Sequence, residues 1–137
     1  MHQFDLKDKT AVITGGAQGF GLDIAKKFLS SGSKVFIWDI DEKELLKATK
    51  KINNPNLIYN IVDVSNFDQV QKSVSNIISN NKIDILINNA GITGATAELW
   101  NYNIKEWNSI IDINLNATFY CCKSVVPHMI KNNYGRI

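Results

Sequence analysis

Short apolar runs rich in β-branched residues alternate along the chain with longer segments of helical periodicity. These runs are Thr10–Thr14, Lys34–Trp38, Leu57–Ile61 and Asp84–Ile87. Their nearly continuous apolar character is typical of strands that are covered on both faces, as in a parallel sheet. Strands that alternate with helices imply right-handed crossovers, so the pattern predicts an α/β fold with a doubly wound parallel sheet.

The first two helices are indicated by signals at their ends. The first follows Gly21, has apolar residues at positions 24, 25, 28 and 29, and ends near Gly32, because glycine is a common stop there. The second begins at Asp41, which has capping-box spacing to Glu44. Pro55 prevents this second helix from continuing far.

Similar signals predict a third helix and a long fourth one. Ser65 and Asp68 open the third, and its expected apolar face consists of Val70, Val74, Ile77 and Ile78. Asn103 and Glu106 open the fourth, and Pro127 should bend or weaken its final turn. The apolar face expected on the fourth helix consists of Trp107, Ile110, Ile111, Leu115, Thr118, Cys122, Val125 and Met129.

The remaining segments are predicted as a loop and an unfinished element. Thr93–Tyr102 has no clear periodicity and is interpreted as a loop. Tyr134–Ile137 resembles a turn that leads into a fifth strand, of which hardly anything is present. We therefore interpret residues 1–137 as one incomplete domain, whose sheet is cut at the start of the fifth strand.

Composition narrows the class of protein. The chain is 45% apolar and 20% charged, and its net charge of +2 comes with scattered Lys and Arg, so nucleic acid is not an expected partner. No apolar stretch is long enough to span a bilayer. Cys121 and Cys122 lack metal or redox spacing and are interpreted as reduced core thiols, while His2 and His128 are isolated, so no metal is expected. These features favour a cytoplasmic protein.

The stretch TGGAQGFG, directly after the first apolar run, is the first candidate for chemistry. A glycine-rich turn between strand and helix brings backbone N–H groups and the positive end of the helix dipole against a pyrophosphate. Gly15 suits the turn, Gly19 the close approach and Gly21 the packing of helix on strand. We assign Gln18 and Phe20 to the same cofactor site. Taken alone, the glycine pattern is weak evidence, because a tight turn is an alternative explanation.

The second strand runs into Asp39, about 20 residues past the glycine loop, where a dinucleotide fingerprint has its ribose-binding acid. Its carboxylate accepts from a 2′-hydroxyl and repels a 2′-phosphate. No Lys or Arg lies in the loop or immediately after Asp39, so NAD is favoured over NADP. We assign Ile40 to the same site. A helix cap is the alternative role for Asp39, although Asp41 suits that role better.

Two further motifs follow the third and fourth strands. Asp63-Val64 and the NNAG run Asn88–Gly91, together with TGGAQGFG and Asp39, resemble the short-chain dehydrogenase/reductase family in its single-domain form. NNAG about 70 residues after the glycine loop is a much sharper signal than either motif alone. The resemblance covers essentially the whole chain, implies a Rossmann-like fold, and is closest to 3-oxoacyl-acyl-carrier-protein reductases and sugar or polyol dehydrogenases.

The resemblance implies roles for these residues. Asp63 would bind the adenine amino group, and Val64 would meet the base through its backbone. The ribose would be lined by Asn89, Ala90 and Gly91. Turn formation is a structural alternative for the asparagines. The resemblance also identifies Asn114 as the catalytic asparagine, which interrupts helix hydrogen bonding and orders a water in a proton relay. The alternative is an inward amide that is satisfied within the core.

The family's catalytic serine and Tyr-x-x-x-Lys signature are absent from the chain. The simplest interpretation is the N-terminal part of a longer enzyme that does not catalyse hydride transfer by itself; a natural half-domain is the alternative. The expected function is an NAD(H)-dependent oxidoreductase that interconverts a secondary alcohol and a carbonyl, with a small-molecule substrate and a homodimer or homotetramer at full length. A non-catalytic NAD-binding or sensing module, or a helix-mediated interaction protein, remains open.

Overall fold

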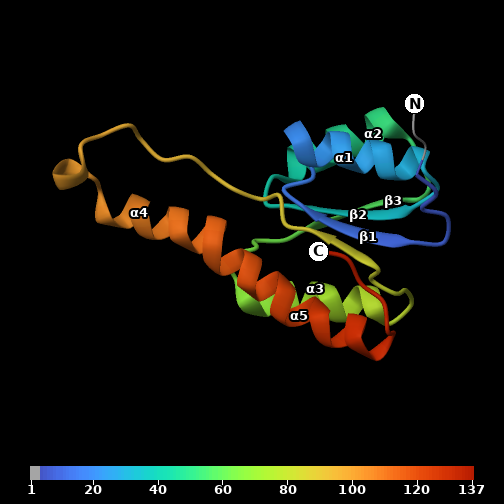
Figure 1. Cartoon of the computed structure of the whole chain (residues 1–137). Helices are drawn as coiled ribbons and strands as arrows, with labels where there is room; N and C mark the ends of the chain where they lie inside the picture. The colour runs from blue at the N-terminus through green and yellow to red at the C-terminus, as the bar shows by residue number, and fades with distance from the viewer. Residues whose placement is uncertain (1–3) are drawn as a thin grey trace.

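The computed structural model describes residues 4–137 and contains a four-stranded parallel sheet in the order β3-β2-β1-β4 (Figure 1). The strands are β1 (Thr10–Thr14), β2 (Lys34–Asp39), β3 (Leu57–Ile61) and β4 (Ile85–Ile87). All four predicted strands are confirmed, although β2 is one residue longer than predicted and β4 begins one residue later. The predicted α/β fold is therefore confirmed.

Helices cover both faces of this sheet, as Figure 1 shows. Helices α1 (Gly19–Ser30) and α2 (Glu42–Ile52) pack on one face, and α3 (Phe67–Ile78) and α5 (Ala117–Lys131) pack on the other. Each face buries alternate strand residues. The face under α1 and α2 contains Ile13, Val35, Ile37, Ala25 and Leu45. The opposite face contains Val12, Phe36, Trp38, Val70, Val74, Cys121 and Val125. This double burial explains why the strands have nearly continuous apolar sequences.

Asp84, which precedes β4, is bound to β1 through both its backbone and its side chain. It is only 8% exposed; its carboxylate accepts from Thr10 N–H at 2.9 Å, and its own N–H donates to the Thr10 carbonyl at 2.9 Å. Beyond β4, Arg136 forms an isolated parallel bridge with Ile85, and its carbonyl accepts from Leu86 N–H at 2.9 Å. The end of the chain therefore lies where a fifth strand was predicted.

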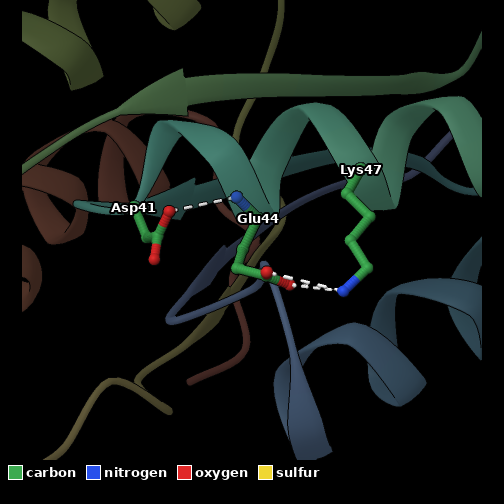
Figure 2. Close-up of polar contacts among 3 residues, drawn as sticks. All are labelled: Asp41, Glu44 and Lys47. Atoms are coloured by element: carbon green, nitrogen blue, oxygen red, sulfur yellow. Dashed lines mark hydrogen bonds and ion pairs between the residues drawn. The ribbon is translucent and has the colours of Figure 1, made fainter.

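The helix starts agree with the prediction at α2 but not at α3. Asp41 Oδ1 accepts from Glu44 N–H at 3.0 Å, and the Glu44 carboxylate pairs with Lys47 at 3.4 Å (Figure 2). Ser65 was the wrong residue for the cap of α3. Asn66 caps this helix instead, because its side-chain oxygen accepts from Gln69 N–H at 3.1 Å. The Ser65 hydroxyl donates to Asp63 Oδ1 at 2.6 Å.

The predicted fourth helix consists of three segments: α4 (Ile104–Ile111), the π-helical turn η2 (Asp112–Asn116) and α5. Its predicted apolar face was wrong in part. The Trp107 and Leu115 side chains are 52% and 61% exposed, and Thr118 is exposed too. The π-helical turn adds one residue to the helical repeat and thereby rotates α5. Positions predicted by continuing the apolar spacing of α4 therefore do not all fall on the buried face of α5. The buried residues of α5 are Ala117, Cys121, Val125 and Met129.

This rotation also decides which cysteine lies in the core. Cys121 is buried, whereas Cys122 is only half-buried, so the prediction of two core thiols was wrong for the second one. Helix α5 continues past Pro127 to Lys131. The predicted loop before α4 contains one short 3-10 turn, η1 (Leu99–Asn101). Within residues 4–137, no helix combines the length and apolar character needed to cross a membrane.

Candidate functional site

A cleft of about 430 Å³ lies at the carboxyl ends of the strands, where open α/β sheets bind ligands. It is lined by Gly15, Gln18, Asp39, Ile40, Asp41, Val62, Asp63, Val64, Asn89, Ala90, Gly91, Ile92 and Ile113. The structure thus brings together every predicted cofactor residue except Gly19, Phe20 and Gly21. Four lining residues were not predicted for this site: Asp41, Val62, Ile92 and Ile113.

The glycine loop joins β1 to α1 at one end of this cleft. Gly19 is the first residue of α1, has a φ of +55°, and has open space where a Cβ would project. Gly21 is buried, and an added Cβ would overlap the Gly15 carbonyl oxygen and lie 2.6 Å from Asn89 Nδ2. Close packing at Gly21 therefore seats α1 against the strand ends, and Gly19 keeps the approach to its first turn open. Phe20, whose side chain is 84% exposed, points away from the core.

Two backbone amides hold the carboxylate of Asp39. Ala17 N–H, from the glycine loop, donates to Asp39 Oδ2 at 3.2 Å, and Asp41 N–H donates to Asp39 Oδ1 at 3.2 Å. Asp39 is half-buried at the end of β2, and the loop is also tied to this strand by Gly16 N–H, which donates to the Trp38 carbonyl at 3.0 Å. The orientation of this carboxylate is therefore set by the same loop that seats α1.

Thr14 links the ends of β1 and β4, a role that the sequence reasoning missed. Its buried hydroxyl oxygen accepts from Asn89 N–H at 3.1 Å and from Ala90 N–H at 3.0 Å. The Asn89 side chain adds two hydrogen bonds between the same two segments, since its Nδ2 donates to the carbonyls of Thr14 and Gly15, each at 3.0 Å. The NNAG segment is thereby fixed against the glycine loop. The signal for this role was available, because Thr14 ends the first apolar run directly before the glycines.

Asp63 has one oxygen engaged by its own turn. Asp63 Oδ1 accepts from Ser65 N–H at 2.9 Å and from the Ser65 hydroxyl at 2.6 Å, and Asp63 N–H donates to Gln69 Oε1 at 3.0 Å. These contacts fix the segment between β3 and α3, so the carboxylate and the neighbouring Val64 both lie at the wall of the cleft.

Asn114 lies in the π-helical turn and contacts the segment that follows β4. Its Oδ1 accepts from Ile92 N–H at 2.8 Å, and its Nδ2 donates to the Ile92 carbonyl at 2.9 Å. The alternative interpretation, an inward amide satisfied within the core, was wrong, because the residue is exposed. Gly91 is close to it, since a Cβ added there would lie 3.3 Å from Asn114 Oδ1. The amide thus joins the π-helical turn to the end of the NNAG segment.

The charge of the cleft is negative. Asp39, Asp41 and Asp63 line it, and its lining contains no Lys, Arg or His. Among the described residues, no group of three or more His, Cys, Asp or Glu side chains could hold a metal ion. His2, which was predicted to be isolated, lies outside the described residues. His128 lies on α5, where its Nε2 accepts a hydrogen bond from Ile83 N–H at 3.2 Å.

Comparisons with known proteins identify the family that the chain resembles. The family model described as short chain dehydrogenase matches residues 9–137. A 2-dehydro-3-deoxy-L-rhamnonate dehydrogenase (NAD(+)) of Sphingomonas sp. strain SKA58 is 38% identical over 130 residues, which are 94% of this chain and 51% of that protein. A 3-oxoacyl-acyl-carrier-protein reductase of Chlamydia trachomatis serovar D is 38% identical over 136 residues, covering 96% of this chain and 54% of the reductase.

A solved structure shares the fold as well. The structure of RhlG from Pseudomonas aeruginosa, an active-site complex with NADP, superposes with a TM-score of 0.84 at 26% sequence identity, covering 96% of this chain and 52% of that one. The chain spans about half the length of the curated relatives that it matches. These relatives include proteins described with NAD(+) and with NADP, so the comparisons leave the choice between the two cofactors to the residues of the cleft.

Proposed function

The chain belongs to the short-chain dehydrogenase family, and we propose that it forms the cofactor-binding part of an NAD(H)-dependent oxidoreductase that interconverts a secondary alcohol and a carbonyl compound. The observation that carries this proposal is the cleft, in which the glycine loop, Asp39, Asp63 and the NNAG segment meet at the carboxyl ends of the strands. The relatives named above are oxidoreductases, and the substrate class of this protein is inferred from them alone.

The residues of the cleft fit a dinucleotide. Gly19 leaves open space at the first turn of α1, where unpaired N–H groups and the helix dipole attract a pyrophosphate. Asp63 and Val64 line the end of the cleft that we assign to adenine, and Asn89, Ala90 and Gly91 line the part that we assign to the ribose. Gln18 and Phe20 flank Gly19, and we propose that they cover the bound phosphates from the solvent side.

The cleft favours NAD over NADP. Asp39 presents a carboxylate whose position is fixed by Ala17 N–H and Asp41 N–H, which suits a hydrogen bond from a ribose 2′-hydroxyl. A 2′-phosphate would meet negative charge there, and the lining offers no Lys or Arg to neutralise it. Ile40 lies next to Asp39 in the lining and supplies an apolar contact for the adenosine.

Bound nicotinamide supplies the hydride acceptor or donor of the reaction. The family resemblance links Asn114, in the π-helical turn, to this chemistry. Its amide is held in both directions by the Ile92 backbone, which keeps the turn beside the NNAG segment. We propose that the turn helps to order a water for proton transfer, as the family resemblance implies for this asparagine.

Calorimetric titration of the chain with NAD and NADP tests the proposal. We expect NAD to bind more tightly than NADP, and Asp39→Asn to reduce that preference by at least about tenfold, because one charge of the site is lost. Glu42→Gln is a matched control, since it removes a carboxylate from the first turn of α2 outside the cleft. If neither cofactor binds, both the cofactor proposal and the alternative of a non-catalytic NAD-binding module fail, and the helix-mediated interaction protein is the alternative that remains.

A second candidate function, helix-mediated association, is favoured by one observation. Helix α4 and the η1 segment extend away from the sheet, and they expose the large apolar side chains of Leu99, Trp100, Ile104 and Trp107 (Figure 1). We propose that the whole protein forms a homodimer or homotetramer that covers these residues. Sedimentation at several protein concentrations tests this association. It should weaken in Trp107→Ser, and a monomer at every concentration would exclude the association.

The cytoplasmic location expected from the sequence stays a prediction.

A further inference from the structure

The segment 92–95, which we call the strap, follows the NNAG segment and leaves the sheet on the side where α4 extends (Figure 1). It has no helix or strand structure of its own, but two of its backbone N–H groups are bound by side chains. Ile92 N–H donates to Asn114 Oδ1 at 2.8 Å, and Ala95 N–H donates to Glu106 Oε1 at 2.7 Å. The strap is therefore tied at both ends to the helical run that begins with α4 and continues into η2.

Between these two ties, the strap lies against α4 itself. A Cβ added at Gly94 would overlap the Tyr102 hydroxyl and Ile110 Cδ1. Tyr102 precedes α4 and meets the Trp107 ring edge-on, with 6.3 Å between the ring centroids. A side chain at Gly94 would have to displace both neighbours, so the strap and α4 are in close contact at this point.

The tie at Ala95 is made by a residue that has another expected role. Glu106 stands three residues after the cap Asn103, where the acid of a capping box returns to the N–H of the cap residue. Here Glu106 Oε1 accepts instead from Ala95 N–H, eleven residues earlier in the chain. The bond is short, as expected for an N–H group that donates to a carboxylate. The start of α4 does not require this contact.

The strap also contributes to the wall of the candidate cofactor cleft. Ile92, its first residue, and Ile113, in η2, both line the cleft. Helix α4 has no buried residue, so packing in the core does not fix the strap from that side. We propose that Glu106 is a positioning residue, which holds the strap against α4 and thereby fixes the Ile92 wall of the cleft before the cofactor binds. This inference rests on the proposed function.

The expected consequence of losing Glu106 is a loss of preorganisation. In Glu106→Ala, the strap keeps its tie to Asn114 and its contact at Gly94, but its far end is released. Binding of NAD must then order the released residues. We therefore expect Glu106→Ala to weaken NAD binding about threefold to tenfold, as measured by calorimetric titration.

Two conservative variants separate the hydrogen bond from the charge. Glu106→Gln keeps an acceptor oxygen at the same reach and removes the charge, so its dissociation constant for NAD should stay within about twofold of that of the original chain. Glu106→Asp keeps the charge in the first turn of α4, but its side chain is too short by a methylene group to reach Ala95. It should therefore bind NAD as weakly as Glu106→Ala does.

Amide exchange provides a readout that does not depend on the cofactor. In the chain without NAD, exchange of Ala95 N–H with deuterated solvent should be slow in the original chain and in Glu106→Gln. It should become as fast as that of an unbound loop amide in Glu106→Ala and Glu106→Asp. Glu98→Ala is the matched control, because it removes an exposed carboxylate that accepts from Asn101 Nδ2 rather than from the strap. This control should change neither Ala95 exchange nor NAD binding.

The outcomes distinguish this inference from the function on which it rests. If the original chain does not bind NAD, the proposed function fails and the role of Glu106 fails with it. If NAD binds and all variants bind it equally, only the role of Glu106 is overturned. It is also overturned if Glu106→Asp behaves like the original chain while Glu106→Gln behaves like Glu106→Ala, because the effect would then come from the charge rather than from the tie to Ala95.

Discussion

At the scale of single residues, two glycines in the first turn of α1 meet opposite physical demands. Gly19 has a positive φ and open space around its missing side chain, whereas Gly21 has no space at all. A methyl group at Gly19 costs about 1–2 kcal/mol for the left-handed conformation, and one at Gly21 costs about 1–3 kcal/mol for overpacking. The two positions therefore differ in what alanine should do to binding.

We predict that Gly19→Ala weakens NAD binding more than it weakens the fold, because its methyl group projects into the space assigned to the pyrophosphate. Gly21→Ala should mainly lower the free energy of unfolding, because its methyl group meets the Gly15 carbonyl and the Asn89 amide. Urea unfolding and calorimetry of both variants measure the two effects. Equal losses of binding and stability in both variants would show that the loop acts only as a turn.

The buried thiol of Cys121 gives a pH dependence. Burial, followed by the neighbouring Cys122, raises the Cys121 pKa from 9.0 to about 12. The unfolded chain loses this proton near the ordinary value while the folded chain keeps it, so the stabilisation is complete below pH 9.0 and is lost as the pH rises towards about 12. The free energy of unfolding should fall by at most about 1.4 kcal/mol per pH unit in this range.

Urea unfolding at several alkaline pH values measures this fall. Cys121→Ala should flatten it, whereas Cys122→Ala should reduce it only in part, because that variant removes the smaller cause and leaves the buried Cys121 thiol in place. Other groups titrate in the same range, so the difference between the two variants is the informative quantity. Identical slopes in both would argue against a buried proton on Cys121.

Much of the candidate site follows from residue types and spacing. Asp39, Asp63 and Asn89 stand directly after apolar runs, and parallel strands bring their carboxyl ends to one edge. Thr14 and Asp41 were not predicted as site residues, because a threonine in a strand and an aspartate before a helix each have an ordinary structural explanation. The cross-strand hydrogen bonds of Thr14 depend on the register of β1 and β4, which the sequence pattern does not define.

At the scale of elements, the strands were predictable and the helix starts were less so. Continuous apolar runs leave few alternatives for β1, β2 and β3. The third helix offered two adjacent polar residues, and the spacing of Ser65 to Asp68 resembles a capping box as closely as that of Asn66 to Gln69. The π-helical turn η2 leaves no trace in the spacing of apolar residues before it, so the rotation of α5 could not be predicted.

The cap of α3 can be tested directly. Asn66→Ala should lower the free energy of unfolding by about 1 kcal/mol, because Gln69 N–H loses its acceptor. Ser65→Ala should have a smaller effect on stability, since the Ser65 hydroxyl donates to Asp63 rather than to the helix. Ser65→Ala should instead weaken NAD binding by freeing the Asp63 carboxylate. The reverse order of stabilities would restore Ser65 as the cap.

At the scale of the whole molecule, the cleft is assembled from segments that follow all four strands. It therefore does not exist in the unfolded chain, and a ligand of the cleft must stabilise the fold by mass action. NAD at about 100 times its dissociation constant should raise the free energy of unfolding by about 2.7 kcal/mol. Urea unfolding with and without NAD measures this gain, and an unchanged midpoint at that concentration would place NAD binding elsewhere or exclude it.

The hydroxyl of Thr14 has a consequence for the motions of the chain. Asn89 and Ala90 lie outside any strand, yet both of their N–H groups donate to this one buried oxygen. Their exchange with deuterated solvent should therefore be as slow as that of strand amides, because opening either bond requires β1 and β4 to separate at their ends. The NNAG segment is a loop by backbone geometry, yet it would open no more often than the sheet does. This side of the cleft would therefore be rigid before the cofactor binds.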